Sequence, residues 1–338
     1  MTSMLEQTLA RIEPADAGAS LAARAELDAK TKPRGSLGRI EALAQQIAGI
    51  RGTAMPRQLS AAIVVAAADH GVAAEGVSAY PQEVTQQMLA NFDSGGAAVC
   101  VLAREAGASL RIVDAGVGRP TDNIAEGPAM SRSVAEQCVE RGIMLAGDLA
   151  AEDVGIVALG EMGIANTTSA AALCAALLPA EPEAVCGRGT GLDDAGVAHK
   201  VEVVRHALSA NAWDLADPLG VLASLGGFEI AVLCGVALGA AAERIVVLLD
   251  GFITGAAALV AVRMAPDTTA AMVAAHVSPE PGHHLVLTEL GLEPLLALGL
   301  RLGEGSGAAL ALPLLRSSLA LLADMATFAA AGVTDAGR

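Results

Sequence analysis

Aromatic side chains are scarce in this 338-residue sequence: Phe, Tyr and Trp together make up 2%, although hydrophobic residues make up 53%. A chain of this length can bury a substantial core. With so few aromatic rings, that core must be built from Ala, Val, Leu and Ile. Small side chains allow close contacts between helices and a sheet, so the composition favours Ala-rich helices joined to strands by glycine turns.

Basic residues are also few. The sequence has 21 Lys and Arg against 37 Asp and Glu, which gives a formal net charge of −16. This excess of negative charge opposes a general affinity for nucleic acid phosphates or anionic lipid. We therefore expect no nucleic-acid partner, and any anionic ligand must be held by local donors.

Motifs for metal binding are missing as well. The cysteines lie far apart with no Cys-x-x-Cys pair, and the histidines show no His-x-x-x-His spacing. We expect no metal site, and most cysteines should serve as small hydrophobic residues. The five cysteines are Cys100, Cys138, Cys174, Cys186 and Cys234.

Long uncharged runs are too short to cross a membrane, which requires about 20 apolar residues. The run 162–178 comes closest, but Asn166 to Ser169 form a polar cluster typical of a helix start. The N-terminus has an acid at Glu6 and no apolar signal segment. These runs are therefore predicted to be core helices of a cytoplasmic protein that does not enter a membrane.

The first part of the chain differs in character from the rest. Residues 1–57 are more polar, and apolar positions at helical spacing predict helices over 21–27 and 40–50. The segment 32–41 between them contains proline and glycines and is predicted to be a loop. We expect 1–57 to contribute to a smaller helical domain. Residues 58–338 should form a Rossmann-like α/β catalytic domain whose C-terminal helices pack on the small domain.

From residue 61 onward, short apolar runs end in glycine-rich or acidic turns and alternate with Ala-rich helical segments. Buried strands alternating with helices predict a doubly wound, mainly parallel sheet in a three-layer α/β/α arrangement. The six predicted strands are 61–68, 109–113, 154–159, 184–186, 245–249 and 272–277.

The polar turns that follow these strands should meet at one edge of the sheet. Ligands of open α/β sheets bind outside the carboxyl ends of the strands. Glycine and Asp are common in any turn between a strand and a helix, so a single turn means little. Six such turns together favour a small-molecule enzyme over a passive binding protein.

The stretch Arg301 to Ala308 places Glu304 among three glycines, directly before the uncharged run 308–315. Glycines allow a ligand to approach the backbone closely. The run behind them is predicted to be a buried helix whose free N–H groups face that ligand. An acid held there can act as a general base. The alternative is that Glu304 only caps the helix.

Two other glycine-containing segments carry possible phosphate contacts. Gly160 to Ser169 runs from a strand end into a helix start, and its hydroxyls and N–H groups suit a phosphate or carboxylate, although Thr167 can equally be a helix cap. It lacks the Gly-Lys-Ser/Thr of a P-loop. Gly187 to Asp194 has glycines that can wrap a ribose phosphate, with Lys200 as counter-charge or simply on a solvated helix face.

Tyr80 is the one tyrosine of the chain, and it lies eight positions before Met88. The two side chains can sandwich a flat aromatic substrate. The alternative is that Tyr80 closes a loop and Met88 fills the core.

Together these segments resemble the nicotinate-nucleotide:dimethylbenzimidazole phosphoribosyltransferase family. The matching blocks span nearly the whole chain in order. They are Lys32-Pro33-Arg34-Gly35-Ser36-Leu37-Gly38, Ala68-Asp69-His70-Gly71-Val72, Val77-Ser78-Ala79-Tyr80-Pro81, Gly160 to Thr168, Gly226-Gly227-Phe228-Glu229, Leu249-Asp250-Gly251-Phe252 and Arg301 to Ala308.

The resemblance implies a homodimer that transfers 5-phosphoribose from nicotinate mononucleotide to 5,6-dimethylbenzimidazole and releases nicotinate. It implies Glu304 as the catalytic base and Tyr80 and Met88 as the benzimidazole pocket. The residues expected to hold the nucleotide are Glu161, Gly163, Thr167, Gly189, Lys200, Ser278 and Gly305. The leaving group is a cationic pyridinium, so neither a cofactor nor a metal is expected.

Two other functions remain open at this stage. A non-catalytic sensor of nucleotides or corrinoid precursors would keep the fold and the pockets, but would need an output domain that the sequence does not show. An NAD-dependent oxidoreductase is disfavoured because no Gly-x-Gly-x-x-Gly follows the first predicted strand.

Overall fold

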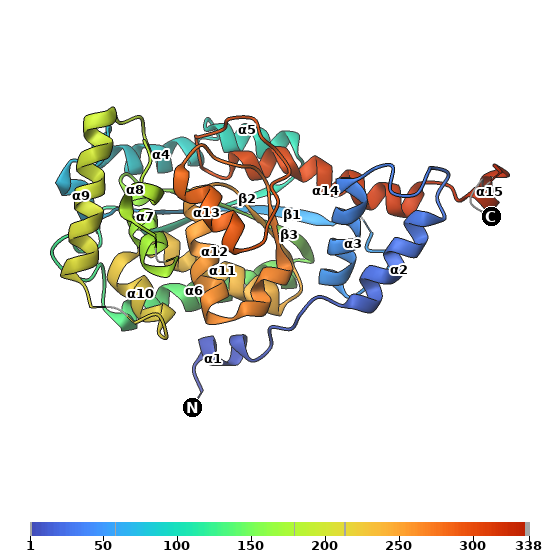
Figure 1. Cartoon of the computed structure of the whole chain (residues 1–338), viewed down its shortest axis with the longest axis horizontal. Coiled ribbons are helices and arrows are strands. Elements are labelled where there is room, and N and C mark those ends of the chain that lie inside the picture. Colours follow the sequence, from blue (N-terminus) through green and yellow to red (C-terminus); the bar gives the residue numbers. More distant parts are fainter. Residues whose placement is uncertain (1, 58, 179, 213, 335–338) are drawn as a thin grey trace.

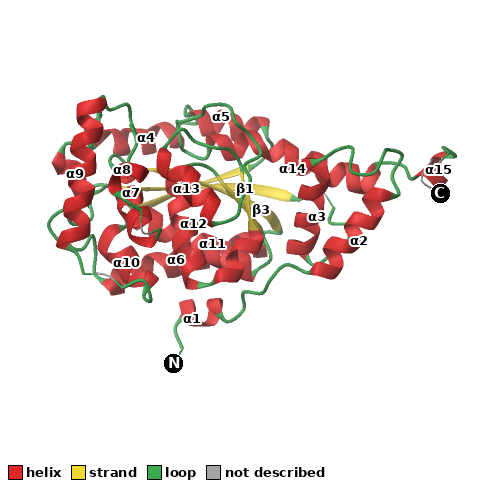
Figure 2. Ribbon diagram, viewed as in Figure 1, coloured by secondary structure: helices red, strands yellow, loops and turns green. Residues whose placement is uncertain are grey.

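The computed structural model describes residues 2–57, 59–178, 180–212 and 214–334. Its centre is a five-stranded parallel sheet in the order β2-β1-β3-β4-β5, with helices on both sides (Figures 1 and 2). The strands are β1 (Ser60–Ala68), β2 (Ser109–Gly116), β3 (Val154–Met162), β4 (Val246–Leu249) and β5 (Met272–Ala274). The predicted doubly wound α/β fold is confirmed.

The helices of the body are α4 (Glu83–Asp93), α5 (Ala98–Glu105), α6 (Arg132–Ala151), α7 (Asn166–Leu177), α8 (Pro182–Val185), α9 (Asp194–Ala210), α10 (Pro218–Leu225), α11 (Phe228–Ala242), α12 (Phe252–Met264), α13 (Pro281–Glu289) and α14 (Ser306–Asp324), with 3₁₀ turns η1 (Gly71–Glu75) and η2 (Pro266–Ala271). Helices α5 and α14 cover one face of the sheet and α6 and α11 the other (Figure 1).

Close packing of small residues holds these layers together. Helices α6 and α11 approach so closely that a Cβ at Gly142 would lie 2.0 Å from the carbonyl oxygen of Val232, and a Cβ at Gly235 would lie 1.9 Å from that of Val139. Only glycine fits at such contacts. Small side chains, in place of aromatic ones, thus allow the backbones of neighbouring helices to pack almost directly on each other.

One predicted strand is wrong. Residues 184–186 do not join the sheet: they belong to the short helix α8 and to the extended residue Cys186 that follows it. Pro182 occupies the start of this helix, where a missing N–H costs nothing. The predicted strand 272–277 is also shorter than expected, because regular pairing ends at Ala274 and only an isolated bridge joins His276 to Leu296.

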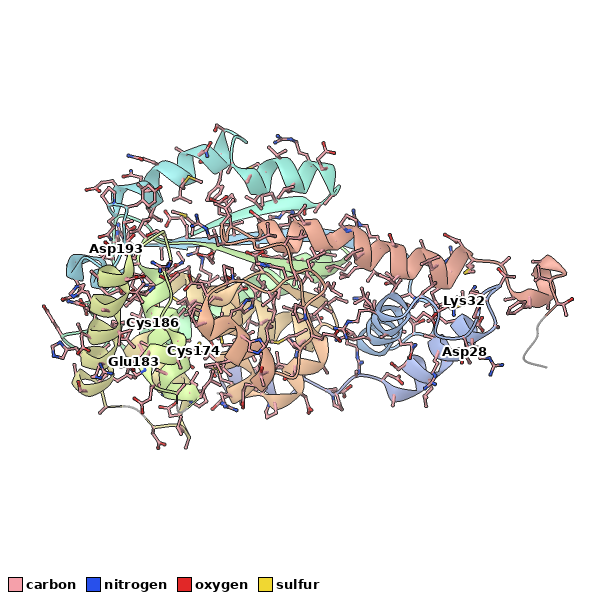
Figure 3. All side chains as sticks on the ribbon, turned by 45° about the horizontal axis from the view of Figure 1, so that its top comes forward. Asp28, Lys32, Cys174, Glu183, Cys186 and Asp193 are labelled. Carbon is pink, nitrogen blue, oxygen red and sulfur yellow. The ribbon has the colours of Figure 1, made fainter. Side chains whose placement is uncertain are left out.

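A small helical unit extends from one end of the sheet. Helices α2 (Ala17–Asp28) and α3 (Arg39–Arg51) pack with the end of α14 around a separate apolar cluster, and α15 (Phe328–Ala331) follows. Figure 3 shows Asp28 and Lys32 at this end of the molecule and Cys186 and Asp193 at the opposite end. The cluster consists of Ala23, Leu27, Ala44, Ala48 and Leu322.

Backbone bonds tie the chain's C-terminal part to this unit, because the N–H groups of Thr31 and Phe328 donate to the carbonyls of Ala326 and Ala29. The loop 32–41 is not simply solvated: Lys32 is buried and pairs with Glu41 at 2.8 Å. Helix α1 (Met4–Leu9) differs from the rest of 1–57, since it packs on α6 and α11 instead of on α2 and α3.

Helix α14 is long and apolar enough, by length and composition, to cross a membrane. In this fold, 56% of its most apolar window is buried inside the protein. Its packing against α3, α5 and β3 gives it the role of a core helix.

Candidate active site

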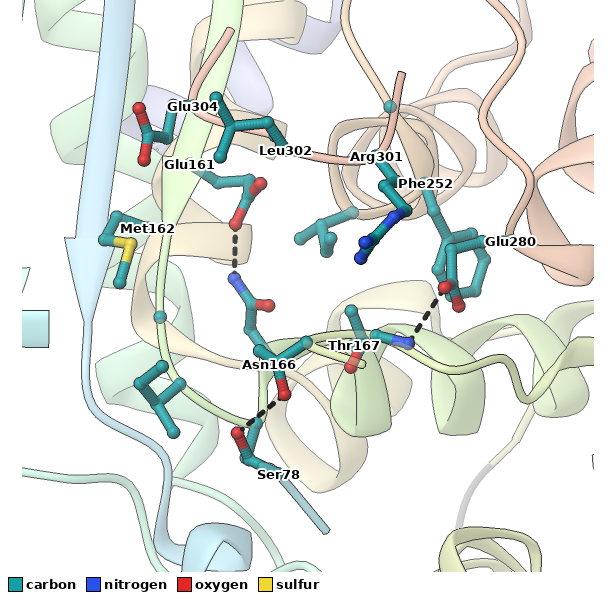
Figure 4. Close-up of a pocket in the computed structure, with 18 of the residues that line it drawn as sticks. Ser78, Glu161, Met162, Asn166, Thr167, Phe252, Glu280, Arg301, Leu302 and Glu304 are labelled. Atoms are coloured by element: carbon teal, nitrogen blue, oxygen red, sulfur yellow. Dashed lines mark hydrogen bonds between the residues drawn. The ribbon is translucent and has the colours of Figure 1, made fainter. Parts of the chain in front are cut away.

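A cavity of about 440 Å³ opens at the carboxyl ends of the strands. Its walls come from the turn after β3, from α4, from the segment after β5 and from the loop 300–304 (Figure 4). The strand order places β2 on one side of β1 and β3, β4 and β5 on the other, so the strand order switches between β1 and β3. Ligands of doubly wound folds bind at such a topological switch point. The cavity has the size of a small-molecule site.

Glu304 lies in a strained turn at the edge of this cavity. Gly303, Glu304 and Gly305 have φ angles of 80°, 63° and 83°, so three consecutive residues adopt the left-handed conformation. The two glycines do so freely, but for Glu304 this conformation costs about 1 kcal/mol or more. The turn is pressed against β3, where a Cβ at Gly160 would lie 2.6 Å from the carbonyl of Glu304.

The Glu304 side chain is only 6% exposed, and its Oε2 has no hydrogen-bond partner in the described part of the chain. Burial, followed by the charge of Asp250, raises the pKa of Glu304 to about 7. A carboxylate that is buried, unpartnered and poised near neutral pH can take a proton from a ligand in the cavity. The alternative role as a helix cap is not observed, because α14 has no side-chain cap.

Glu161 stands next to Glu304 at the end of β3 (Figure 4). Burial raises the pKa of Glu161 to about 8, and the charges of Asp250 and Glu229 add to the rise. Hydrogen bonds from Asn166 and from the Glu304 backbone act in the opposite direction. The Asn166 Nδ2 donates to Glu161 Oε2 at 2.6 Å, which holds the side chain in place. The raised pKa favours the protonated form of Glu161 near neutral pH, and in that form its carboxyl O–H can donate a hydrogen bond to a ligand hydroxyl.

The opposite wall is built around the start of α7. Lys200 is fully buried, and its Nζ donates to Thr167 Oγ1 at 2.7 Å. Burial lowers the pKa of Lys200, although the charge of Glu280 opposes this effect. Gly189 is pressed into the same corner, because a Cβ there would lie 2.8 Å from Thr167 Oγ1, and its N–H donates to Glu280 Oε1 at 2.9 Å.

Most of the residues predicted from the sequence meet at this cavity. Tyr80 lies at its mouth, 55% exposed, and Met88 of α4 lines it. Lys200 and Gly305 do not line the cavity themselves. Lys200 donates a hydrogen bond to Thr167, which does line it, and Gly305 follows Glu304 in the left-handed turn. The predicted residues on the wall itself are Tyr80, Met88, Glu161, Gly163, Thr167, Gly189, Ser278 and Glu304.

One expectation for the site is wrong. The first N–H groups of α14 do not face the ligand, because the N–H of Gly305 donates to Asp250 Oδ2 at 3.2 Å and that of Ala308 to Asp250 Oδ1 at 2.9 Å. A carboxylate of the protein itself thus occupies the helix start. The reason is tertiary, since Asp250 follows β4 and reaches α14 only in the folded sheet.

Sequence reasoning assigned no role to several polar residues at the cavity. Arg301 is the single Lys or Arg on the wall within the described ranges, and its guanidinium points into the cavity between Glu161 and Glu280 (Figure 4). Asp250 directly follows the predicted strand 245–249, and Glu280 lies in the turn after the predicted strand 272–277. Because both follow predicted strands, their positions in the sequence indicated the carboxyl edge of the sheet, where ligands bind.

A family model described as phosphoribosyltransferase matches residues 12–333. The nicotinate-nucleotide–dimethylbenzimidazole phosphoribosyltransferase of Desulforudis audaxviator is 50% identical over 98% of this chain and 99% of its own. The protein of the same name from Roseiflexus sp. (strain RS-1) is also 50% identical, over 98% of both chains.

Solved structures agree with these relatives. A crystal structure of nicotinate-nucleotide–dimethylbenzimidazole phosphoribosyltransferase from Thermus thermophilus superimposes with a TM-score of 0.89 at 43% identity, covering 95% of this chain and 99% of that one. A structure of CobT from the same organism gives a TM-score of 0.90 at 44% identity, over 94% and 99%. The chain belongs to the nicotinate-nucleotide–dimethylbenzimidazole phosphoribosyltransferase family.

Proposed function

We propose that this protein transfers 5-phosphoribose from nicotinate mononucleotide to 5,6-dimethylbenzimidazole, giving α-ribazole 5′-phosphate and nicotinate, a step in assembling the lower ligand of cobalamin. Family membership favours this enzyme over a non-catalytic sensor. The observation that carries the proposal is the buried Glu304 carboxylate, which faces the cavity with one oxygen unpartnered.

The reaction fits a site with one well-placed base. A ring nitrogen of the benzimidazole attacks C1′ of the ribose as the bond from C1′ to the pyridinium nitrogen breaks. The bonding pair returns to that nitrogen and neutralises its charge. The other ring nitrogen of the benzimidazole becomes acidic, and Glu304 takes up its proton. Attack opposite the leaving group converts a β linkage into an α linkage.

We assign the donor's phosphate to the corner formed by Gly163, Thr167, Gly189 and Ser278, with buried Lys200 as its counter-charge. The start of α7 lies in this corner, and the Thr167 hydroxyl that accepts from Lys200 is a possible partner of the phosphate. Protonated Glu161 is placed to donate to a ribose hydroxyl. Gly305 serves the site by allowing the Glu304 turn to form.

Tyr80 and Met88 are proposed to contact the flat acceptor base. Both line the cavity, as does Leu302 of the loop that carries Glu304. An apolar slot of this kind suits a planar heterocycle. It leaves the substituents of the base to be recognised by shape.

Glu304→Gln tests the proposed mechanism. Protein incubated with nicotinate mononucleotide and dimethylbenzimidazole should release nicotinate, measured by liquid chromatography. The variant should lose roughly 100-fold or more in kcat, because the amide cannot take the proton. Glu293→Gln is a matched control, since Glu293 lies in the same segment but is exposed and paired with Arg39. Equal rates for the wild type and Glu304→Gln would remove Glu304 from the mechanism.

We further propose that the protein is a cytoplasmic homodimer, as the family resemblance implies, and that the helical unit acts as a smaller domain beside the catalytic one. The separate apolar cluster of α2, α3 and α14 supports this division. Light scattering after size-exclusion chromatography would check the dimer, and a single-chain mass would contradict it. Cell fractionation would check the location.

A further inference from the structure

The carboxylate of Asp250 sits directly beneath the Glu304 turn and takes no part in the reaction proposed above. We infer that Asp250 is a positioning residue: it holds the Glu304 turn in its strained shape and supplies the fixed negative charge against which Glu304 accepts the substrate's proton. This inference rests on the proposed function, because it concerns how the base of that reaction is prepared.

Asp250 accepts two backbone hydrogen bonds from the Glu304 turn and the start of α14. Its Oδ2 accepts the N–H of Gly305 at 3.2 Å and its Oδ1 accepts the N–H of Ala308 at 2.9 Å. Gly305 is the residue after Glu304 and has a φ of 83°. Asp250 itself is 1% exposed and comes from the end of β4, so it is anchored by the sheet. Its two bonds oppose relaxation of the left-handed turn.

The charge of Asp250 acts on the same group that its hydrogen bonds position. The charged groups nearest the Glu304 turn are Glu161 from the end of β3 and Asp250 from the end of β4, whereas Arg301 points into the cavity between Glu161 and Glu280. Behind these lie Glu229, which acts on Glu161, and His276, whose Nε2 is 3.5 Å from Asp250 Oδ1. Asp250 is the charge that raises the pKa of Glu304, after burial.

His276 also contacts Asp250. Burial lowers the pKa of His276, but its hydrogen bond and attraction to Asp250 outweigh burial, so the net shift is upward. His276 packs closely on the start of α14, because a Cβ at Gly307 would lie 2.1 Å from the ring. The ring approaches Asp250 Oδ1, which also accepts the N–H of Ala308, whereas Asp250 Oδ2 accepts the N–H of Gly305 in the Glu304 turn.

A neutral acceptor cannot replace both functions of Asp250. The amide of Asn has one acceptor oxygen, and its NH₂ group would oppose one of the two N–H donors. Asp250→Asn therefore removes the charge and weakens one bond. Asp250→Ser removes the same charge with a smaller side chain whose hydroxyl accepts a single bond. Both variants lose the charge and at least one of the two hydrogen bonds, so the pH dependence of the rate is measured in addition to the rate itself.

The experiment measures kcat against pH, from nicotinate release, for the wild type, Asp250→Asn and Asp250→Ser. Exposed Asp267→Asn, which precedes β5, is the control. In both Asp250 variants the acidic limb of the kcat–pH profile, where the rate rises as Glu304 loses its proton, should move to lower pH by roughly one unit. In addition, kcat at pH 8 should fall about tenfold because the Glu304 turn relaxes. Titration of the acceptor base itself is common to all four proteins and cancels in the comparison.

An acidic limb that stays in place in both variants would overturn the inference, even if kcat falls, because removing the charge of Asp250 should move the limb. Limbs that move in opposite directions would overturn it too. Thermal melts check that the variants are folded, and failure of both to fold would assign Asp250 to folding alone. An inactive wild type would instead refute the proposed function.

Discussion

At the scale of single residues, the cavity brings acids and cations together in an unusual ratio. Glu161, Glu280 and Glu304 line it, whereas Arg301 is the one cationic side chain on the described wall and Lys200 stands behind it. A donor with a phosphate and a carboxylate needs both cations. The protonated form of Glu161, favoured by burial, reduces the repulsion that such a donor would otherwise meet.

Arg301 should therefore be required for binding the anionic donor. Arg301→Met is expected to raise KM for nicotinate mononucleotide by roughly tenfold or more with a smaller change in kcat, because the contact is made equally in the ground and transition states. Steady-state kinetics with saturating dimethylbenzimidazole measure both constants. Arg301→Lys should recover part of the loss, and exposed Arg119→Met serves as the control. An unchanged KM in Arg301→Met would show that the guanidinium does not contact the donor.

At the scale of elements, the site depends on how closely the 303–305 turn approaches β3. Gly160 lies within the strand, and the absence of a side chain there lets the backbone of Glu304 rest on it. The same turn is held from below by Asp250 after β4. Two neighbouring strands thus position the base, which agrees with the placement of functional groups on rigid elements.

Gly160→Ala should displace the turn. The added Cβ would lie 2.6 Å from the Glu304 carbonyl, so the variant is expected to lose roughly 1–3 kcal/mol of stability and 10- to 100-fold in kcat. Urea unfolding and nicotinate release measure the two effects. Gly147→Ala in α6 is a matched control: nothing lies within 4 Å of its added Cβ, and it should stabilise the helix by about 0.5–1 kcal/mol. Full activity in Gly160→Ala would contradict the close approach.

At the scale of the whole molecule, the active site lowers the stability of the ligand-free protein. Burial raises the pKa values of Glu161 and Glu304 to about 8 and 7, from an ordinary value of 4.5. Between pH 4.5 and these values the folded protein binds protons that the unfolded chain has released. Stability from these two groups therefore decreases as pH rises across this window. Enzymes commonly trade stability for such sites.

The double variant Glu161→Gln/Glu304→Gln should remove this dependence. Its free energy of unfolding, measured in urea at several pH values between 5 and 8, should fall less with rising pH than that of the wild type. The other titrating groups are common to both proteins and cancel. Glu289→Gln, at a partly exposed pair with Arg263, should leave the slope unchanged. Identical slopes for the double variant and the wild type would mean that neither carboxylate holds its proton in the folded state.

Much of this molecule could be predicted because strands and turns leave local patterns. The apolar runs that became β1, β3 and β4 are buried on both faces, and burial on both faces is what a continuous apolar run indicates. Their polar carboxyl ends indicated where the cavity lies. The run 184–186 looked the same but became part of α8, since periodicity in three residues cannot separate a strand from a buried helix.

The sequence by itself determined the doubly wound fold, the family and the place of Glu304 in a glycine turn, because these depend on residues adjacent or regularly spaced along the chain. Only the tertiary structure decided that Asp250 accepts hydrogen bonds at the start of α14, that Lys200 donates to Thr167, and that Arg301 lies between Glu161 and Glu280. These partners lie far apart in the sequence, and the order of strands in the sheet brings them together.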